Sequence, residues 1–408
     1  MNVLTDTPDM ALRARARRVI PGGMYGHMRS EGLPAGYPQF FARGEGCHLW
    51  DVNGRRYIDF MCSWGPIILG HLHPEVREAA ERQLALGDCL NGPSERMVEL
   101  AERLVTLLPH ADWAMFAKNG TDATTTCVTI ARATTGRRKI LVAKGAYHGA
   151  VPWCTPNPLG VTSEDRAHLL HFTFNDIASL ESAVDQAGGD LAGILVSAFR
   201  HDYAQDQHLP DAAFARRMRE LCDATGAALI LDDVRAGFRL SLRGSWDALG
   251  VQPDMSAWSK AIANGYALAA VTGNERFRDA ASRIYVTGSF WYSAVAMAAA
   301  LATLDCLERD NGPEHMRAMG QRFRDGIAAQ AKAAGIGVRQ SGPPQMPTIL
   351  FDDDATFAKG ERFCAEALKR GVYLHPKHNM FLSAAHTEAD IDEALAATQQ
   401  AFAALQTG

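Results

Sequence analysis

The chain lacks the features that mark several large classes of protein. No apolar run in its 408 residues reaches the roughly 20 residues that a membrane-spanning helix needs, so we expect no membrane partner. A net charge of −5 leaves no basic surplus, which argues against nucleic acid as the main partner. The absence of G-x-G-x-x-G and G-x-x-x-x-G-K-[ST] counts against a site for a dinucleotide or a nucleoside triphosphate.

Cysteine is present but not in a pattern that binds metal. The eight cysteines are scattered without a C-x-x-C spacing, so the sequence predicts neither a zinc site nor a disulfide framework. The basic stretch 11–18 is not followed by an apolar signal core, which argues against export. We therefore expect reduced thiols and a cytoplasmic location, and we expect no metal in the site.

Strands and helices alternate through the middle of the chain. A chain of 408 residues is too long for a single hydrophobic core of ordinary size, which suggests more than one domain. The strand–helix alternation favours an α/β fold with a mostly parallel, doubly wound sheet. Helices are expected at 121–133 and 211–225. Short apolar runs mark the expected strands at 113–116, 140–143, 193–199, 227–234, 255–259 and 268–273.

The two ends of the chain have a different pattern. Residues 38–60 alternate and carry Asn53-Gly54, which predicts an antiparallel hairpin. After about residue 310, helices at 313–334, 357–370 and 388–405 accompany short strands near 348–352 and 372–374. We predict a large α/β domain at 61–295 and a smaller α+β domain built from 1–60 with 296–408.

Two charged residues end neighbouring predicted strands. The run from Ala227 is unbroken and apolar until Asp232, and a second run ends at Lys260. In open α/β sheets the chemistry lies outside the carboxyl ends of the strands, so an acid and a lysine placed there can meet in one crevice. A carboxylate for a pyridine nitrogen and a lysine for a Schiff base are the minimal equipment of a pyridoxal-phosphate enzyme. The alternative is that both are ordinary exposed residues at strand ends.

A turn between a strand and a helix suits a phosphate. Gly120 and Thr121 open the helix at 121–133, where free backbone amides and the helix dipole favour an anion. The same three residues Asn-Gly-Thr also fit a plain N-cap at Asn119. After the next strand, Tyr147 has the type of side chain that stacks on a cofactor ring, and His148 follows it. These two also fit a rim tyrosine and a hydrogen-bonded loop histidine.

These pieces, in this order, resemble the class III, fold-type I aminotransferases, and most closely the glutamate-1-semialdehyde aminomutases. The resemblance runs from about residue 8 to the C-terminus. It implies the fold-type I architecture, pyridoxal 5′-phosphate as cofactor and a homodimer with its active sites at the subunit interface. Its most specific stretches are 60–71, 119–124, 145–149, 231–239 and 383–387.

The resemblance also implies roles for single residues. Lys260 would hold the cofactor as a Schiff base, with Asp232 on the ring nitrogen. A partner subunit would supply Ser289 to the phosphate, where a threonine is usual in the family. Arg29 would bind a substrate carboxylate beside Trp64, although it also fits a surface arginine. The remaining cofactor contacts implied are Gly120, Thr121, Tyr147, His148, Val234 and, near the phenolic oxygen, Asp202.

The chain departs from the family where the substrate is expected. The segments 197–202, 263–269, 292–294 and 375–379 all differ from the usual family sequence, and a carboxylate expected near the substrate is missing. We therefore predict that glutamate-1-semialdehyde is not the substrate. The predicted activity is a ping-pong aminotransferase, working through aldimine and ketimine, on a carboxylate-bearing amino compound and a carbonyl acceptor. The alternatives are an aminomutase or epimerase on the same scaffold, and a cofactor-binding protein without catalysis.

Overall fold

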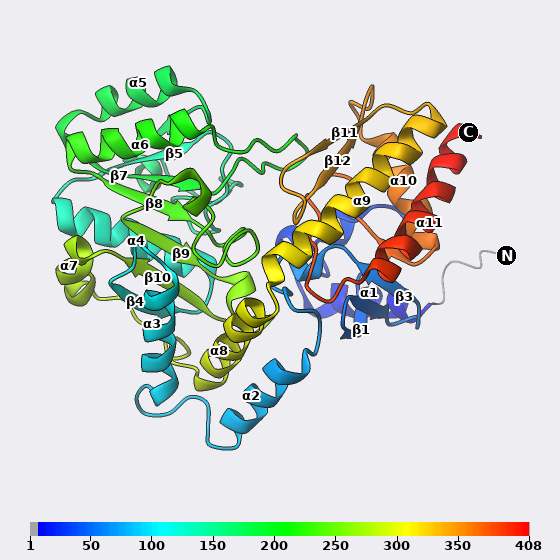
Figure 1. Cartoon of the computed structure of the whole chain (residues 1–408), viewed down its shortest axis with the longest axis horizontal. Coiled ribbons are helices and arrows are strands. Elements are labelled where there is room, and N and C mark those ends of the chain that lie inside the picture. Colours follow the sequence, from blue (N-terminus) through cyan, green and yellow to red (C-terminus); the bar gives the residue numbers. More distant parts are fainter. Residues whose placement is uncertain (1–6, 408) are drawn as a thin grey trace.

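The computed structural model describes residues 7–407. Figure 1 shows two lobes, one built around a large sheet and the other carrying the C-terminal helices and two small sheets. No helix within residues 7–407 is both long and apolar enough to cross a membrane.

The large sheet has seven strands in the order β4-β10-β9-β8-β7-β5-β6. All are parallel except β10, which runs antiparallel to both of its neighbours. The central strands β7 and β8 are buried at every residue, as expected for a sheet covered on both faces. The strands are β4 (Trp113–Ala117), β5 (Lys139–Ala143), β6 (Leu169–Phe172), β7 (Leu191–Ser197), β8 (Ala228–Asp232), β9 (Met255–Trp258) and β10 (Ala269–Gly273).

Helices cover both faces of this sheet. The apolar residues of α4 and α7 pack on one face, and those of α5 and α6 pack on the other. This two-sided packing is the doubly wound arrangement that the strand–helix alternation predicts. These helices are α4 (Gly120–Thr135), α5 (Ile177–Ala187), α6 (Ala212–Thr225) and α7 (Arg278–Arg283).

The second lobe joins the two ends of the chain. Strand β13 near the C-terminus pairs in parallel with β3 near the N-terminus, which closes the sheet β1-β2-β3-β13. Its strands are β1 (Phe41–Glu45), β2 (His48–Asp51), β3 (Arg56–Asp59) and β13 (Val372–Tyr373), and a two-stranded sheet holds β11 (Val338–Ser341) and β12 (Thr348–Phe351). The α-helices of the chain that remain to be given bounds, in either lobe, are α1 (Pro8–Val19), α2 (Pro74–Leu84), α3 (Glu95–Leu107), α8 (Ala294–Arg309), α9 (Gly312–Ala334), α10 (Ala358–Lys369) and α11 (Glu388–Gln406).

The predicted elements are present with shifts of a few residues at their ends. The elements that were not predicted include β6, α5, α7 and β11. Asp211 occupies the N-cap of α6, but its side chain makes no capping hydrogen bond there. The domain boundaries at 60/61 and 295/296 stay predictions; α8 begins close to the second, at Ala294.

Candidate active site

One cavity lies at the carboxyl edge of the large sheet. Its volume is about 340 Å³, and segments that follow β4, β5, β7, β8 and β9 all contribute to it. This is the edge at which an open α/β sheet presents its ligand site. The residues that line it are Asn119, Gly120, Thr121, Thr124, Tyr147, His148, Gly149, His201, Asp232, Val234, Arg235, Ser259 and Lys260.

Asp232 is the last residue of β8 and is held on both of its carboxylate oxygens. Oδ2 lies 2.7 Å from His148 Nδ1, and Oδ1 accepts a hydrogen bond of 3.1 Å from the amide of Val234. Because a carboxylate can only accept, Nδ1 of His148 is the donor. The next carboxylate, Asp233, is buried outside the cavity and accepts hydrogen bonds from Ser245. The fold therefore presents one of the two adjacent acids to the cavity.

Lys260 enters the same cavity two residues after the end of β9. Its backbone has φ of +48°, in the left-handed region that a side chain with a β-carbon rarely adopts. Burial, together with the charge of Arg235, lowers the pKa of its amine to about 7, while the charge of Asp232 opposes this shift. A lysine with this pKa is partly unprotonated at neutral pH, which is the state that attacks a carbonyl or accepts a proton.

The N-terminus of α4 forms the opposite end of the cavity. Asn119 caps the helix: its side chain accepts from the amide of Asp122 at 3.1 Å, and Asp122 returns a bond to the amide of Asn119. A β-carbon on Gly120 would lie 2.7 Å from Val234 Cγ1, so glycine is needed for this close packing. The cap and the glycine leave the first turn of a 16-residue helix facing the cavity.

These donors fit pyridoxal phosphate. The helix N-terminus with the Thr121 hydroxyl suits a phosphate, the anionic Asp232 suits a protonated pyridine nitrogen, and the amine of Lys260 suits an aldehyde. Tyr147 lines the cavity but is 45% exposed, so one side of its ring is open. A second glycine, Gly149, has no room for a β-carbon because Thr121 Oγ1 would be 2.7 Å away.

Aromatic rings from distant segments pack around Trp64. Its ring makes edge contacts with His27, His375 and His378, at centroid distances of 5.0, 5.5 and 4.9 Å. The three residues 62–64 all have positive φ, which is a costly conformation for residues other than glycine. Strained backbone of this kind gathers at functional sites.

Four residues predicted for the site, namely Trp64, Asp202, Ser289 and Arg29, are not among those that line the cavity. Asp202 forms an ion pair of 2.8 Å with Arg200 Nε and lies against Gly145. Ser289 lies in an exposed loop, and Arg29 is exposed near the start of the chain. Their roles stay predictions.

The lining residues that were not predicted for the site include His201, Arg235 and Ser259. Burial lowers the pKa of His201 well below its usual value. A weak signal for these residues exists, because each lies within four residues of the end of a strand whose carboxyl end was already expected to face the site.

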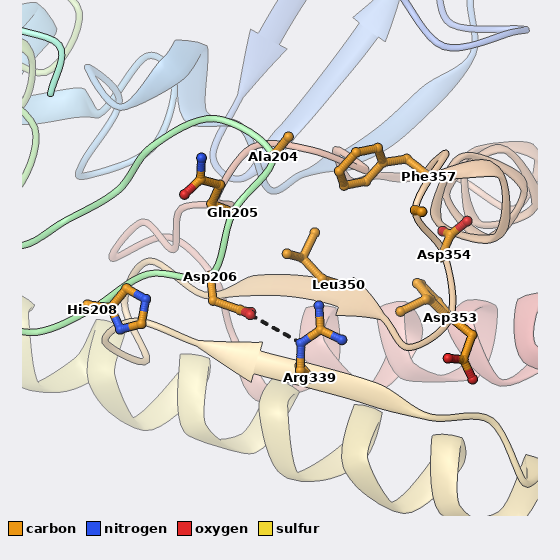
Figure 2. Close-up of a pocket in the computed structure, with 11 residues that line it drawn as sticks. Ala204, Gln205, Asp206, His208, Arg339, Leu350, Asp353, Asp354 and Phe357 are labelled. Atoms are coloured by element: carbon orange, nitrogen blue, oxygen red, sulfur yellow. Dashed lines mark hydrogen bonds and ion pairs between the residues drawn. The ribbon is translucent and has the colours of Figure 1, made fainter. Parts of the chain in front are cut away.

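A second cavity of about 520 Å³ lies between the segment after β7 and the β11–β12 sheet. Figure 2 shows Asp206 from that segment paired with Arg339 of β11, at 3.1 Å. No lysine is among its lining residues, so within residues 7–407 it offers no amine for carbonyl chemistry.

Comparison with known proteins gives long matches. Residues 34–402 match the family model for class-III aminotransferases. The aminopentol aminotransferase of Sphingopyxis macrogoltabida is 51% identical over 394 residues, which cover 97% of this chain and 93% of that protein. The glutamate-1-semialdehyde 2,1-aminomutase of Neisseria gonorrhoeae is 35% identical, with 96% and 97% covered. The solved PLP internal aldimine form of the FumI protein of Sphingopyxis sp. MTA144 superposes with a TM-score of 0.97 at 51% identity, covering 98% of this chain and 96% of that one.

Proposed function

The chain belongs to the class III aminotransferases, and from that membership we propose that it moves an amino group from a primary amine to a 2-oxo acid. The observation that carries the proposal is the meeting of Lys260 and Asp232 in one cavity. Bound pyridoxal phosphate supplies an electron sink for the bond that breaks beside the amine nitrogen. The chain must do the rest: hold the cofactor, move the proton and choose the substrates.

We propose that Lys260 moves the proton. Its pKa of about 7 lets the amine accept a proton from the substrate carbon and return it. Asp232, fixed by His148 and the Val234 amide, keeps the proton on the ring nitrogen. The proposed phosphate contacts are Gly120 and Thr121, and the proposed ring contacts are Tyr147, His148 and Val234, with Asp202 beside the phenolic oxygen.

Two classes of amino donor have support. The sequence predicts a carboxylate on the donor that is held by Arg29. The name of the 51% identical relative supports an amino alcohol instead. A screen of amino acids, each paired with the amine that lacks only the carboxylate, distinguishes the two classes of donor. The readout is the change in absorbance of the cofactor as it takes up the amino group. Efficient turnover of glutamate-1-semialdehyde would count against the substrate prediction. Failure of every primary amine to change the cofactor absorbance would count against the proposed activity.

Arg29→Ala is expected to raise the KM for an acidic donor and to leave neutral amines unchanged. A buried guanidinium–carboxylate pair is worth roughly 2–4 kcal/mol in transition-state binding, and an exposed one is worth less. Arg29 is exposed in the single chain, so the size of the effect reports whether a bound substrate or a partner subunit covers it. Steady-state kinetics on donors with and without a carboxylate is the measurement, and an equal change for both would refute the role.

We propose a homodimer with the active sites at its interface. The loop around Ser289 supports this, because Tyr285 is 93% and Phe290 is 58% exposed, and exposed apolar side chains of this size mark interaction surfaces. Ser289→Ala is expected to weaken cofactor binding roughly 3- to 10-fold, the effect of one lost hydrogen bond. Thr287→Ala, an exposed hydroxyl two residues away, is the control.

Ultracentrifugation and cofactor titration test the dimer together. A sedimenting dimer with weaker cofactor binding only in the Ser289 variant is the expected result. A fully active monomer would overturn the proposal.

The cytoplasm is the proposed compartment. All eight cysteines are free thiols, and most are buried. Free thiols in this number suit a reducing environment.

A further inference from the structure

Arg235 is a charged residue of the cavity, and no side chain of opposite charge within residues 7–407 forms an ion pair with it. It follows Asp232 by three residues and lines the cavity together with Lys260. Its Nη1 donates to Asn379 Oδ1 at 2.7 Å and to His378 Nε2 at 3.0 Å. Asn379 is neutral, and burial together with the charge of Arg235 keeps the pKa of His378 well below its usual value. Both partners are therefore uncharged.

The nearby carboxylates are engaged elsewhere. Asp232 is bonded to His148, and Asp202 is paired with Arg200. Burial lowers the pKa of Arg235 only to about 10, so the guanidinium stays charged at neutral pH. No carboxylate within residues 7–407 lies in salt-bridge contact with it. Arg235 is partly buried, and a charge withdrawn in part from water without a counter-ion favours the binding of an anion.

The free edge of the guanidinium has the geometry that a carboxylate prefers. In the described part of the chain the hydrogen bonds of Arg235 all leave from Nη1, so Nε and Nη2 remain available. This edge of an arginine offers two parallel N–H bonds to the two oxygens of a carboxylate. By contrast, Arg239 is fully buried and donates from both Nη atoms to backbone carbonyls, including that of Gly65, at 2.8 Å from Nη2. Arg239 is structural, whereas Arg235 has donors to spare.

We propose that Arg235 binds the carboxylate next to the reacting carbon of the 2-oxo acid acceptor. This rests on the proposed function and deepens it by naming the residue that selects the acceptor. A 2-oxo acid whose carbonyl carbon reaches the reacting centre beside Lys260 brings its adjacent carboxylate into the same cavity that Arg235 lines. Arg29 would then serve only a carboxylate at the far end of a substrate. An acceptor without a carboxylate, such as a simple aldehyde, leaves Arg235 unpaired, so the residue favours acids in the acceptor step.

Equilibrium binding of propanoate to the cofactor-loaded enzyme tests this without turnover. Propanoate carries the carboxylate but has neither the 2-oxo group nor an amine, so it cannot react. Propanamide is its neutral analogue. Arg235→Gln is expected to weaken propanoate binding roughly 30-fold or more, the effect of losing one buried charged partner, and to change propanamide binding less than about 3-fold. Arg235→Lys keeps the charge without the fork and is expected to fall in between.

The comparison variant is Arg29→Ala, which is expected to bind propanoate like the wild type. Calorimetry gives the affinities, and cofactor content with the melting temperature confirms that each variant folds. If Arg235→Gln does not fold, Arg235→Lys alone decides the question. Unchanged propanoate binding in a folded Arg235 variant would overturn the proposal, as would a loss in Arg29→Ala instead. An altered pH dependence of the cofactor absorbance with unchanged propanoate affinity would also overturn it, since Arg235 would then serve the cofactor.

Failure of the proposed function is distinguishable from these outcomes. Amino transfer by the wild-type enzyme is compared with propanal and with pyruvate as acceptor. Transfer to propanal but not to pyruvate would refute the proposal that the acceptor is a 2-oxo acid. The binding experiment would still show whether Arg235 holds a carboxylate.

Discussion

Replacing Lys260 by alanine is expected to lower the rate of amino transfer by roughly four orders of magnitude or more, because one amine both anchors the cofactor and carries the proton. The amine lies in the cavity and its pKa lies near 7, so no solvent base replaces it at the same place. Single-turnover absorbance, with the variant loaded with cofactor, measures the loss in each half-reaction.

Lys144→Ala is the matched control for this experiment. Lys144 also follows a strand of the large sheet at its carboxyl end, but its side chain is exposed and does not line the cavity. Its variant is expected to keep nearly the full rate. A Lys260 variant that retained a tenth of the wild-type rate would mean that another group moves the proton.

Asp232→Asn is expected to slow both half-reactions roughly 1,000-fold, about 4 kcal/mol, while the protein stays folded. An amide of the same shape fills the site but carries no negative charge, so the ring nitrogen loses its proton and the electron sink weakens. His148 is only 2.7 Å away and is expected to change its tautomer to accept from the new amide.

The control is Asp233→Asn, one residue further along the chain. Asp233 is as buried as Asp232, but it bonds to Ser245 and lies outside the cavity. Its substitution is expected to lower stability more than activity, which stopped-flow rates and thermal melting separate. Similar rates in the two variants would show that Asp232 has no electronic role.

The pair of Asp232 and Lys260 was predictable because each follows a continuous apolar run that forms a buried strand. β8 and β9 are buried at every residue, and parallel neighbours deliver their next residues to one edge. The aminotransferase activity and the cofactor, predicted from the family resemblance, are confirmed by a family match over residues 34–402. The fold class was predictable because alternating strands and helices fit few architectures other than a parallel sheet covered by helices.

Arg235 was not predictable as a site residue. Its hydrogen-bond partners lie 143 and 144 residues further along the chain, so no local pattern indicates that its side chain lines the same cavity as Lys260. The missed strands have a simpler reason. β6 is at the edge of the sheet and only its last residue is fully buried, and β11 has no fully buried residue, so neither shows a clear apolar run.

The most direct test of the account is borohydride reduction of the purified, cofactor-loaded protein, followed by peptide mapping. Reduction converts the bond between cofactor and lysine into a stable amine, so the label marks the residue that held it. The account predicts that the label is found on the peptide containing Lys260, and that the Lys260→Ala variant is not labelled. A label on any other lysine would contradict it.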